Sequence, residues 1–164
     1  MTAPIGDYLV RMGMISEKQR VLILEEQRLS GRPFGQIAEE MFGVKARDVE
    51  RAWAAQYAGM SEPVNPTLER IDPLVLGLVT RRQAWQFRIL PMRYEAGSLL
   101  VCTTQEHLPR AANFATRNIP ATCFFVLALP EALGEALMRY YPMDGMTPDM
   151  VTEFTAGESL RQSA

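Results

Sequence analysis

The sequence predicts an α+β protein in which a tandem helical-hairpin repeat precedes a small α/β subdomain with a three-stranded sheet. One pattern of glycine, apolar residues and a closing glutamine occurs twice within residues 4–56, with an offset of 29 residues. The next stretch is rich in glycine and proline, as linkers are. Strand and helix patterns then alternate as β-β-α-β-α, which favours a small sheet covered by helices on one side. The predicted parts are a repeat subdomain, a linker, an α/β subdomain and a flexible tail, over residues 1–57, 58–66, 67–141 and 142–164.

The first repeat predicts two helices joined by a short turn. Apolar residues spaced as on one helix face predict a helix over 5–12, and Gly13 ends it in the usual position of a left-handed C-cap. Ser16 and Gln19 have the spacing of a capping box, after which a second helix continues over 21–29.

The second repeat predicts the same arrangement, with helices over 34–42 and 46–57. Its internal stop is Gly43, one residue later than the repeat step would place it. Pro33 suits the first helical position, because its nitrogen has no hydrogen to leave unpaired there. The five residues from Arg28 to Arg32 form the spacer between the two repeats.

The α/β part begins with helical turns. Asp72 suits the N-cap of a helix over 73–79, and a further turn runs through residues 82 and 85. Two apolar stretches around a Glu-Ala-Gly turn predict a β-hairpin, and Pro91 marks its first strand as an edge strand or as bulged. The predicted elements from here on are strands over 87–94 and 98–104, a helix over 108–118, a strand over 121–129 and a helix over 130–141.

Composition narrows the class of function. The chain has 164 residues, of which 48% are hydrophobic and 22% are charged, as in ordinary soluble globular proteins. Its net charge of −2 gives no basic field, so we expect no DNA or RNA partner. No apolar run has the length of a membrane span, and the first residues lack signal-peptide features. We therefore expect no membrane insertion and a cytoplasmic location, which includes the cytoplasmic domain of an inner-membrane protein.

The sequence contains no set of catalytic residues, so we predict that the chain is not an enzyme and has no metal or cofactor. His107 is the only histidine, which excludes a multi-histidine metal site. No Gly-Lys pair is present to form a Walker-type phosphate loop. Cys102 and Cys123 lie in apolar stretches and are expected to be buried free thiols. Trp53 and Trp85 are expected in the core.

The duplicated motif resembles a known family. P-I-G-D-Y-L-V-R-M-G-M-I-S-E-K-Q-R-V-L-I-L-E-E-Q, residues 4–27, is similar to the repeated motif in the N-terminal domain of type II secretion and type IV pilus assembly ATPases, in its MshE-type, cyclic di-GMP-binding form. In that family the motif is also written twice across a five-residue spacer. The stretch 69–104 resembles the α/β half of the family. The same domain also occurs at the C-terminus of membrane glycosyltransferases of the bacteriophage adsorption protein B kind.

The resemblance implies a site for cyclic di-GMP, which carries two guanines and two phosphates on a near-symmetric ring. A duplicated helical unit offers each half of this ligand a similar surface. Gly6 and Gly35 lie in first helical turns, whose N–H groups can face a phosphate or a guanine oxygen. Gln27 and Gln56 both donate and accept hydrogen bonds, which matches a guanine edge. The other ligand-binding residues that we predict are Ile5, Leu9, Val10, Gly13, Met14, Ile15, Leu24, Arg28, Arg32, Phe34 and Ala38.

The sequence departs from the family's pattern at several positions. The motif arginine that stacks on guanine is replaced by Pro4 and by Pro33, and Thr104 and Gln105 replace an acidic residue after the second strand. The pair Ala38-Glu39 stands where the family has two hydrophobic residues, so the sequence argument favours the first half of the site.

Two functions follow from these observations. The first is a non-catalytic cyclic di-GMP sensor domain that regulates a fused or associated effector, either a polysaccharide-export glycosyltransferase or a secretion or pilus ATPase. The alternative is a docking module of the same fold that binds a secretion-machinery partner and no nucleotide. In that case the repeat glycines permit close helix crossing and the apolar residues form a core stripe.

Overall fold

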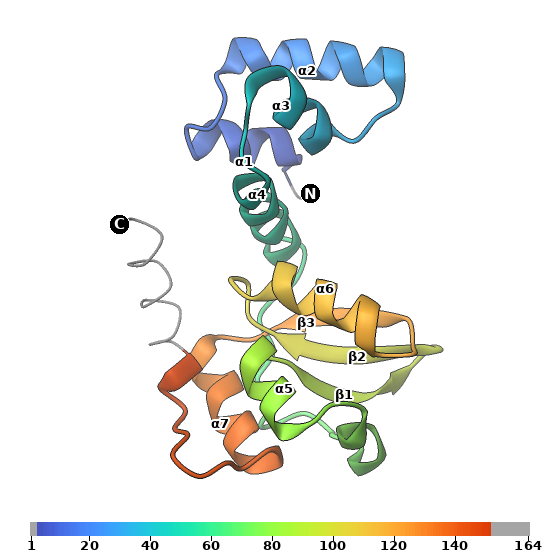
Figure 1. Ribbon diagram of the computed structural model, residues 1–164, viewed down its shortest axis with the longest axis vertical. Helices are drawn as coiled ribbons and strands as arrows, with labels where there is room; N and C mark the ends of the chain where they lie inside the picture. The colour runs from blue at the N-terminus through green and yellow to red at the C-terminus, as the bar shows by residue number, and fades with distance from the viewer. Residues whose placement is uncertain (1–2, 152–164) are drawn as a thin grey trace. The chain divides into compact units, whose positions relative to one another are not determined.

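The computed structural model describes residues 3–151 of the chain. The chain divides into two compact units after Ser61. The first unit is helical, and the second combines three strands with helices (Figure 1). The predicted α+β class is therefore confirmed.

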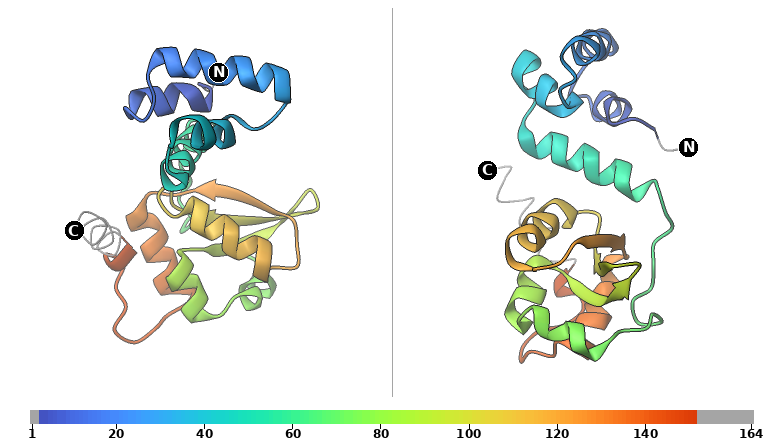
Figure 2. Two further views of the ribbon diagram at one scale, coloured as in Figure 1. Left: turned by 45° about the horizontal axis from the view of Figure 1, so that its top comes forward. Right: turned by 90° about the vertical axis from the view of Figure 1, so that its right-hand side faces the viewer.

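The helical unit contains the four helices of the two repeats, and the repeats exchange partners. Its helices are α1 (Ile5–Arg11), α2 (Glu17–Ser30), α3 (Phe34–Phe42) and α4 (Ala46–Ala58). The most extensive contacts join α1 with α4 and α2 with α3. Figure 2 shows these four helices, coloured from blue to teal, from two further sides. The first helix of each repeat therefore packs on the second helix of the other repeat.

Local signals set most helix ends as predicted. The Ser16 hydroxyl accepts from the Gln19 backbone N–H at 3.1 Å, and the Gln19 side chain accepts from the Ser16 N–H at 2.8 Å. These two bonds complete the predicted capping box before α2. Gly13 and Gly43 have left-handed backbone, with φ of +73° and +66°. α3 has the predicted bounds, but Pro33 is its N-cap residue and not its first helical residue.

The apolar stripes of the four helices form one core. Its buried members are Leu9, Ile15, Ile23, Phe34, Ile37, Ala38, Val44 and Ala52. Full burial of a large aliphatic or aromatic side chain contributes about 1.5–3 kcal/mol. Leu9, Ile15 and Ala38, which we predicted as ligand contacts, are at most 4% exposed. Their observed role is to pack this core, and their contact with a ligand stays a prediction.

The α/β unit is built on a three-stranded sheet with the order β1-β2-β3. β1 (Leu90–Glu95) pairs antiparallel with β2 (Ser98–Thr103), which pairs parallel with β3 (Cys123–Leu127). Parallel strands need a crossover, and α6 (Leu108–Asn118) supplies it. The other helices of this unit are η1 (Pro73–Leu78), α5 (Arg81–Phe87) and α7 (Pro130–Tyr140).

The first strand lies at the edge of the sheet, as predicted. Its pairing register shifts between Pro91 and Arg93, which is the predicted irregularity. Its start is later than predicted, because Phe87 still belongs to α5 and Arg88 has a left-handed backbone with φ of +53°. The chain therefore turns before Leu90, where the strand begins.

The two faces of the sheet differ in burial. Leu99 and Val101 point to the same side and have no exposed surface. On the opposite side, Leu100 is half-buried and its pairing partner Phe124 is 57% exposed. Among the helices of residues 3–151, none has the length and apolar character that crossing a membrane requires.

Residues 142–151 pack against the α/β unit, although the sequence predicts a flexible tail from residue 142. A Cβ atom at Gly134 of α7 would lie closer to the Pro148 carbonyl than the 3.0 Å that real Cβ atoms keep. Val151 is fully buried in the same core. The first part of the predicted tail is thus a packed segment, and its remainder lies outside the described residues.

Candidate ligand-binding site

An apolar groove lies on the helical unit beside the start of α3. Its volume is about 350 Å³. The residues that line it come from α1, from the start of α3 and from α4: Ile5, Pro33, Phe34, Gly35, Gln36, Val49, Glu50 and Trp53. Most of them belong to the second repeat, whereas the sequence argument favoured the first.

Sequence reasoning identified only part of this lining. Ile5, Phe34 and Gly35 are among the predicted ligand-binding residues. Trp53 was expected in the core, yet it is half-buried, lines the groove and lies 5.9 Å from the Tyr57 ring, centroid to centroid. The 29-residue step indicates such a role, because Trp53 corresponds to Leu24 of the first repeat, which is a predicted ligand-binding residue.

The two repeat glycines are positions of close packing. A Cβ atom at Gly35 would lie closer to Val49 Cγ1 than any real Cβ contact. At Gly6, a Cβ atom would lie 2.9 Å from Phe34 Cζ and 3.3 Å from Arg20 Cγ. Neighbouring side chains therefore occupy the space that a Cβ atom would need, and glycine permits this close packing at both positions. This is the structural role that the sequence left open beside ligand binding.

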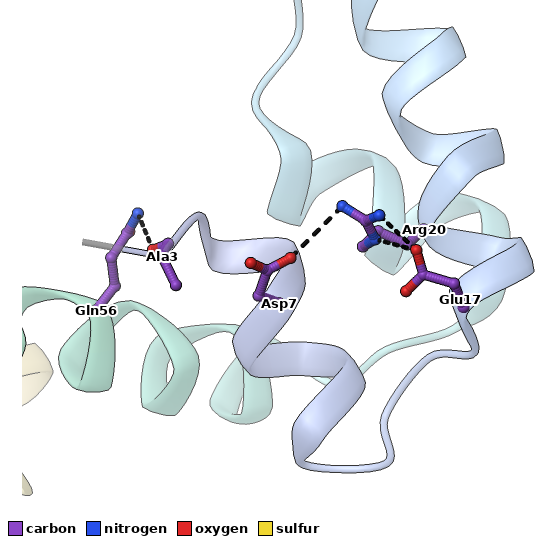
Figure 3. Close-up of polar contacts among 5 residues, drawn as sticks. All are labelled: Ala3, Asp7, Glu17, Arg20 and Gln56. Atoms are coloured by element: carbon purple, nitrogen blue, oxygen red, sulfur yellow. Dashed lines mark hydrogen bonds and ion pairs between the residues drawn. The ribbon is translucent and has the colours of Figure 1, made fainter. Parts of the chain in front are cut away.

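The two repeat glutamines tie the repeats together. Gln27 Nε2 donates to the Arg32 carbonyl at 3.2 Å, and Gln56 Nε2 donates to the Ala3 carbonyl at 3.4 Å (Figure 3). Ala3 and Arg32 are themselves 29 positions apart, and each precedes the proline that starts a repeat. Each glutamine therefore binds the start of the other repeat, which matches the exchange of helix partners. The predicted role of these glutamines at a guanine edge stays a prediction.

A cluster of three charged residues joins α1 to α2. Arg20 Nη1 lies 3.5 Å from Asp7 Oδ1, and Arg20 Nε donates to Glu17 Oε1 at 2.9 Å (Figure 3). The repeat step places Arg20 opposite Val49 and Asp7 opposite Gln36. The two repeats thus differ in charge beside their glycines, and the 29-residue step makes this difference visible in the sequence.

The other predicted site residues, all within the described range, do not line the groove. Met14 and Leu24 are 39% and 42% exposed. Arg28 is exposed in the last turn of α2, and Arg32 forms an ion pair with Glu40. Val10 is half-buried against the core and Gly13 forms the turn after α1, so neither faces the groove.

Titratable side chains of the α/β unit are buried in structural roles. His107 Nδ1 lies 2.8 Å from the Thr104 hydroxyl oxygen, and burial, reinforced by Arg88 and Arg110, lowers the pKa of His107 to about 4. Burial raises the pKa of the Cys102 thiol to about 12, which leaves it protonated and unreactive. Across residues 3–151, no cluster of three or more His, Cys, Asp or Glu side chains could bind a metal ion.

Fold and site together define a class: a two-part α+β domain in which a duplicated helical unit carries a groove. Residues 46–147 match the MshEN domain family. The chain belongs to this family. The matched residues run from α4 through the α/β unit, so they include Trp53 and Gln56 of the repeat unit but neither of the two repeat glycines.

The chain is also similar to a solved structure described as "Structure of MshE with cdg". The sequences are 21% identical, the TM-score is 0.48, and the similarity covers 85% of this chain and 99% of that chain. No curated protein sequence matches the chain.

Proposed function

We propose that the chain is a cyclic di-GMP-binding regulatory domain without catalytic activity of its own. Membership of the MshEN family and the duplicated motif support this ligand. The observation that carries the proposal is the exchange of partners between the repeats, because it brings two related surfaces into one unit. A ligand with two similar halves fits such a pair of surfaces.

The groove has the chemistry to receive one guanine. Its volume of about 350 Å³ lies within the usual range of ligand pockets, and its lining is mostly apolar. Trp53 offers an aromatic face on which a base can stack. The carboxylate of Glu50 can accept the hydrogen bonds that guanine donates from its edge. These two residues belong to one helix, so they would bind the same base.

Titration calorimetry with cyclic di-GMP tests the proposal. We expect heat of binding and a dissociation constant in the micromolar range. Trp53→Leu should raise that constant by about fivefold or more, because base–aromatic stacking contributes about 1–3 kcal/mol. Phe124→Leu is the matched control, since Phe124 is an exposed aromatic residue of the other unit. The absence of any heat of binding up to a ligand concentration of about 1 mM would refute the proposal. That concentration corresponds to a binding free energy weaker than about 4 kcal/mol.

A docking module of the same fold is the second candidate, and exposed side chains of α2 favour it. Val21, Leu22 and Leu29 are 53%, 43% and 72% exposed. Exposed apolar side chains that gather on one element mark protein contacts. A docking module would be silent in the nucleotide titration and would bind a secretion-machinery protein through α2. Leu29→Ser should then abolish that binding, while the Phe124→Leu control should leave it unchanged.

We propose further that the domain acts in the cytoplasm on a fused or associated effector. The candidates are a polysaccharide-export glycosyltransferase and a secretion or pilus ATPase. The test is the effector's activity with and without cyclic di-GMP, in the wild-type protein and in Trp53→Leu. A ligand effect that persists unchanged in the variant would contradict regulation through the groove.

A further inference from the structure

In the first repeat, a charged side chain takes the place that is apolar in the second. Arg20 stands 29 positions before Val49, and each of the two packs against the glycine of its own repeat. Val49 lines the groove. Arg20 instead places its Cγ atom 3.3 Å from the Cβ position of Gly6. Beside its glycine the first repeat therefore has a methylene group of Arg20, whose side chain continues to a guanidinium, where the second repeat has a methyl group of Val49.

Arg20 does not line the groove, but it shares the neighbouring residue Gly6 with Phe34, which does. The Phe34 ring approaches the Cβ position of Gly6 to 2.9 Å, on the glycine that Arg20 also contacts, and the same Phe34 lines the groove. Ile5, which adjoins Gly6 in the chain, lines the groove as well. A ligand that fills the groove and extends toward the first repeat would thus meet Arg20.

The guanidinium of Arg20 is bound by two carboxylates and is still reachable. It pairs with Asp7 on α1 and with Glu17 on α2, and its side chain is 27% exposed. Asp7 and Glu17 are themselves 35% and 63% exposed, so an incoming anion can displace them. A guanidinium matches phosphate geometry through its fork of N–H donors. The sequence has proline, not arginine, at the two motif positions Pro4 and Pro33.

We propose that Arg20 is the phosphate-binding residue of the first half of the site, and that Asp7 and Glu17 occupy it until the ligand arrives. The inference rests on the proposed function and adds that the two halves of the site bind the ligand through different chemical groups. The second repeat receives a base in its apolar groove, and the first repeat binds a phosphodiester by exchanging one anion for another at Arg20. The two halves of a symmetric ligand are then bound by different means.

The test is calorimetry of the full chain with cyclic di-GMP and four variants. Arg20→Gln should raise the dissociation constant by about tenfold or more, as expected for a lost hydrogen bond to a charged group. Arg20→Lys should recover part of the affinity. Asp7→Asn should tighten binding by up to about fivefold, because an exposed ion pair no longer competes. The control is Arg117→Gln, an exposed arginine of α6, which should bind as the wild type does.

Salt dependence separates binding from a merely structural role. Affinity of the wild type should fall with added salt, and Arg20→Gln should flatten this dependence, because a screened charge–charge contact has been removed. If the wild type binds and Arg20→Gln binds equally well, the inference is overturned while the proposed function stands. If Asp7→Asn binds cyclic di-GMP and the wild type does not, the inference is supported. If neither the wild type nor Asp7→Asn gives heat of binding, the inference and the proposed function are both overturned. If Arg20→Gln fails to fold, Arg20→Lys and Asp7→Asn decide: unchanged affinity in both overturns the inference.

Discussion

Replacing Gly35 by alanine should destabilise the helical unit. The added methyl group would lie closer to Val49 Cγ1 than the 3.0 Å limit of real Cβ contacts, and Val49 is a stiff, β-branched side chain between two packed helices. Overpacking of this kind costs about 1–3 kcal/mol. Alanine in place of a helical glycine returns about 1 kcal/mol through its better helix propensity. The expected net loss in the free energy of unfolding is therefore up to about 2 kcal/mol.

A double-mutant cycle assigns this loss to its cause. Val49→Ala removes the atom that the new methyl group meets, so Gly35→Ala should cost less in that background, with a coupling energy of about 1 kcal/mol or more. Gly77→Ala is the matched control, because nothing lies within 4 Å of its Cβ position. Gly6→Ala should cost less than Gly35→Ala, since the methyl group would meet the end of the Phe34 ring and the flexible Arg20 side chain, at distances longer than the contact with Val49.

Urea denaturation followed by the indole N–H resonances is a suitable assay, because the chain has two tryptophans and each unit contains one. Trp53 reports on the helical unit and Trp85 on the α/β unit. Gly35→Ala should shift the Trp53 transition and leave the Trp85 transition in place. Equal stability of Gly35→Ala and Gly77→Ala, or a cost that Val49→Ala does not relieve, would refute the reasoning.

Three further results are expected. Burial lowers the folded-state pKa of His107 from 6.5 to about 4, so the unfolded chain binds more protons between these values. Stability of the α/β unit should therefore fall as the pH drops through this window, by on the order of 3 kcal/mol, and His107→Gln should flatten the pH profile of urea denaturation; equally steep profiles would contradict this. Gly134→Ala should displace the 142–151 segment and speed its cleavage in limited proteolysis, and an unchanged cleavage rate would argue against the close contact. Gln56→Ala removes the hydrogen bond to the Ala3 carbonyl and should cost about 1 kcal/mol in urea denaturation, an effect whose absence would show the bond to be unimportant.

Signals confined to a few neighbouring residues could be predicted from the sequence. The capping box of Ser16 and Gln19, the left-handed turns at Gly13 and Gly43, and the irregular pairing at Pro91 depend on local backbone geometry, which the residue type itself restricts. The start of β1 was predicted three residues early, because an apolar alternation in the sequence continues back into the end of α5.

Features that depend on packing between distant segments were not predicted. Apolar periodicity shows that a helix has a buried face, but not which helix covers it. It could not reveal that α1 packs on α4, nor that Val49 and Phe34 occupy the space beside the repeat glycines. For the same reason Trp53 was assigned to the core, although its ring lines a groove. The packing of residues 142–151 depends on the absence of a side chain at Gly134, and the sequence of that segment has no periodicity to indicate it.

The exchange of partners between the repeats has a consequence for how the helical unit opens. Because α1 packs on α4, contacts between the first and last helices complete the unit. These contacts join segments that lie near opposite ends of the unit's sequence. Release of either end removes the partner of the other, so we expect the amides of α1 and α4 to exchange with solvent water at one common rate. Both halves of the candidate site would then be lost in one opening event. A ligand that bridges them would shift a single equilibrium between the open and the closed helical unit.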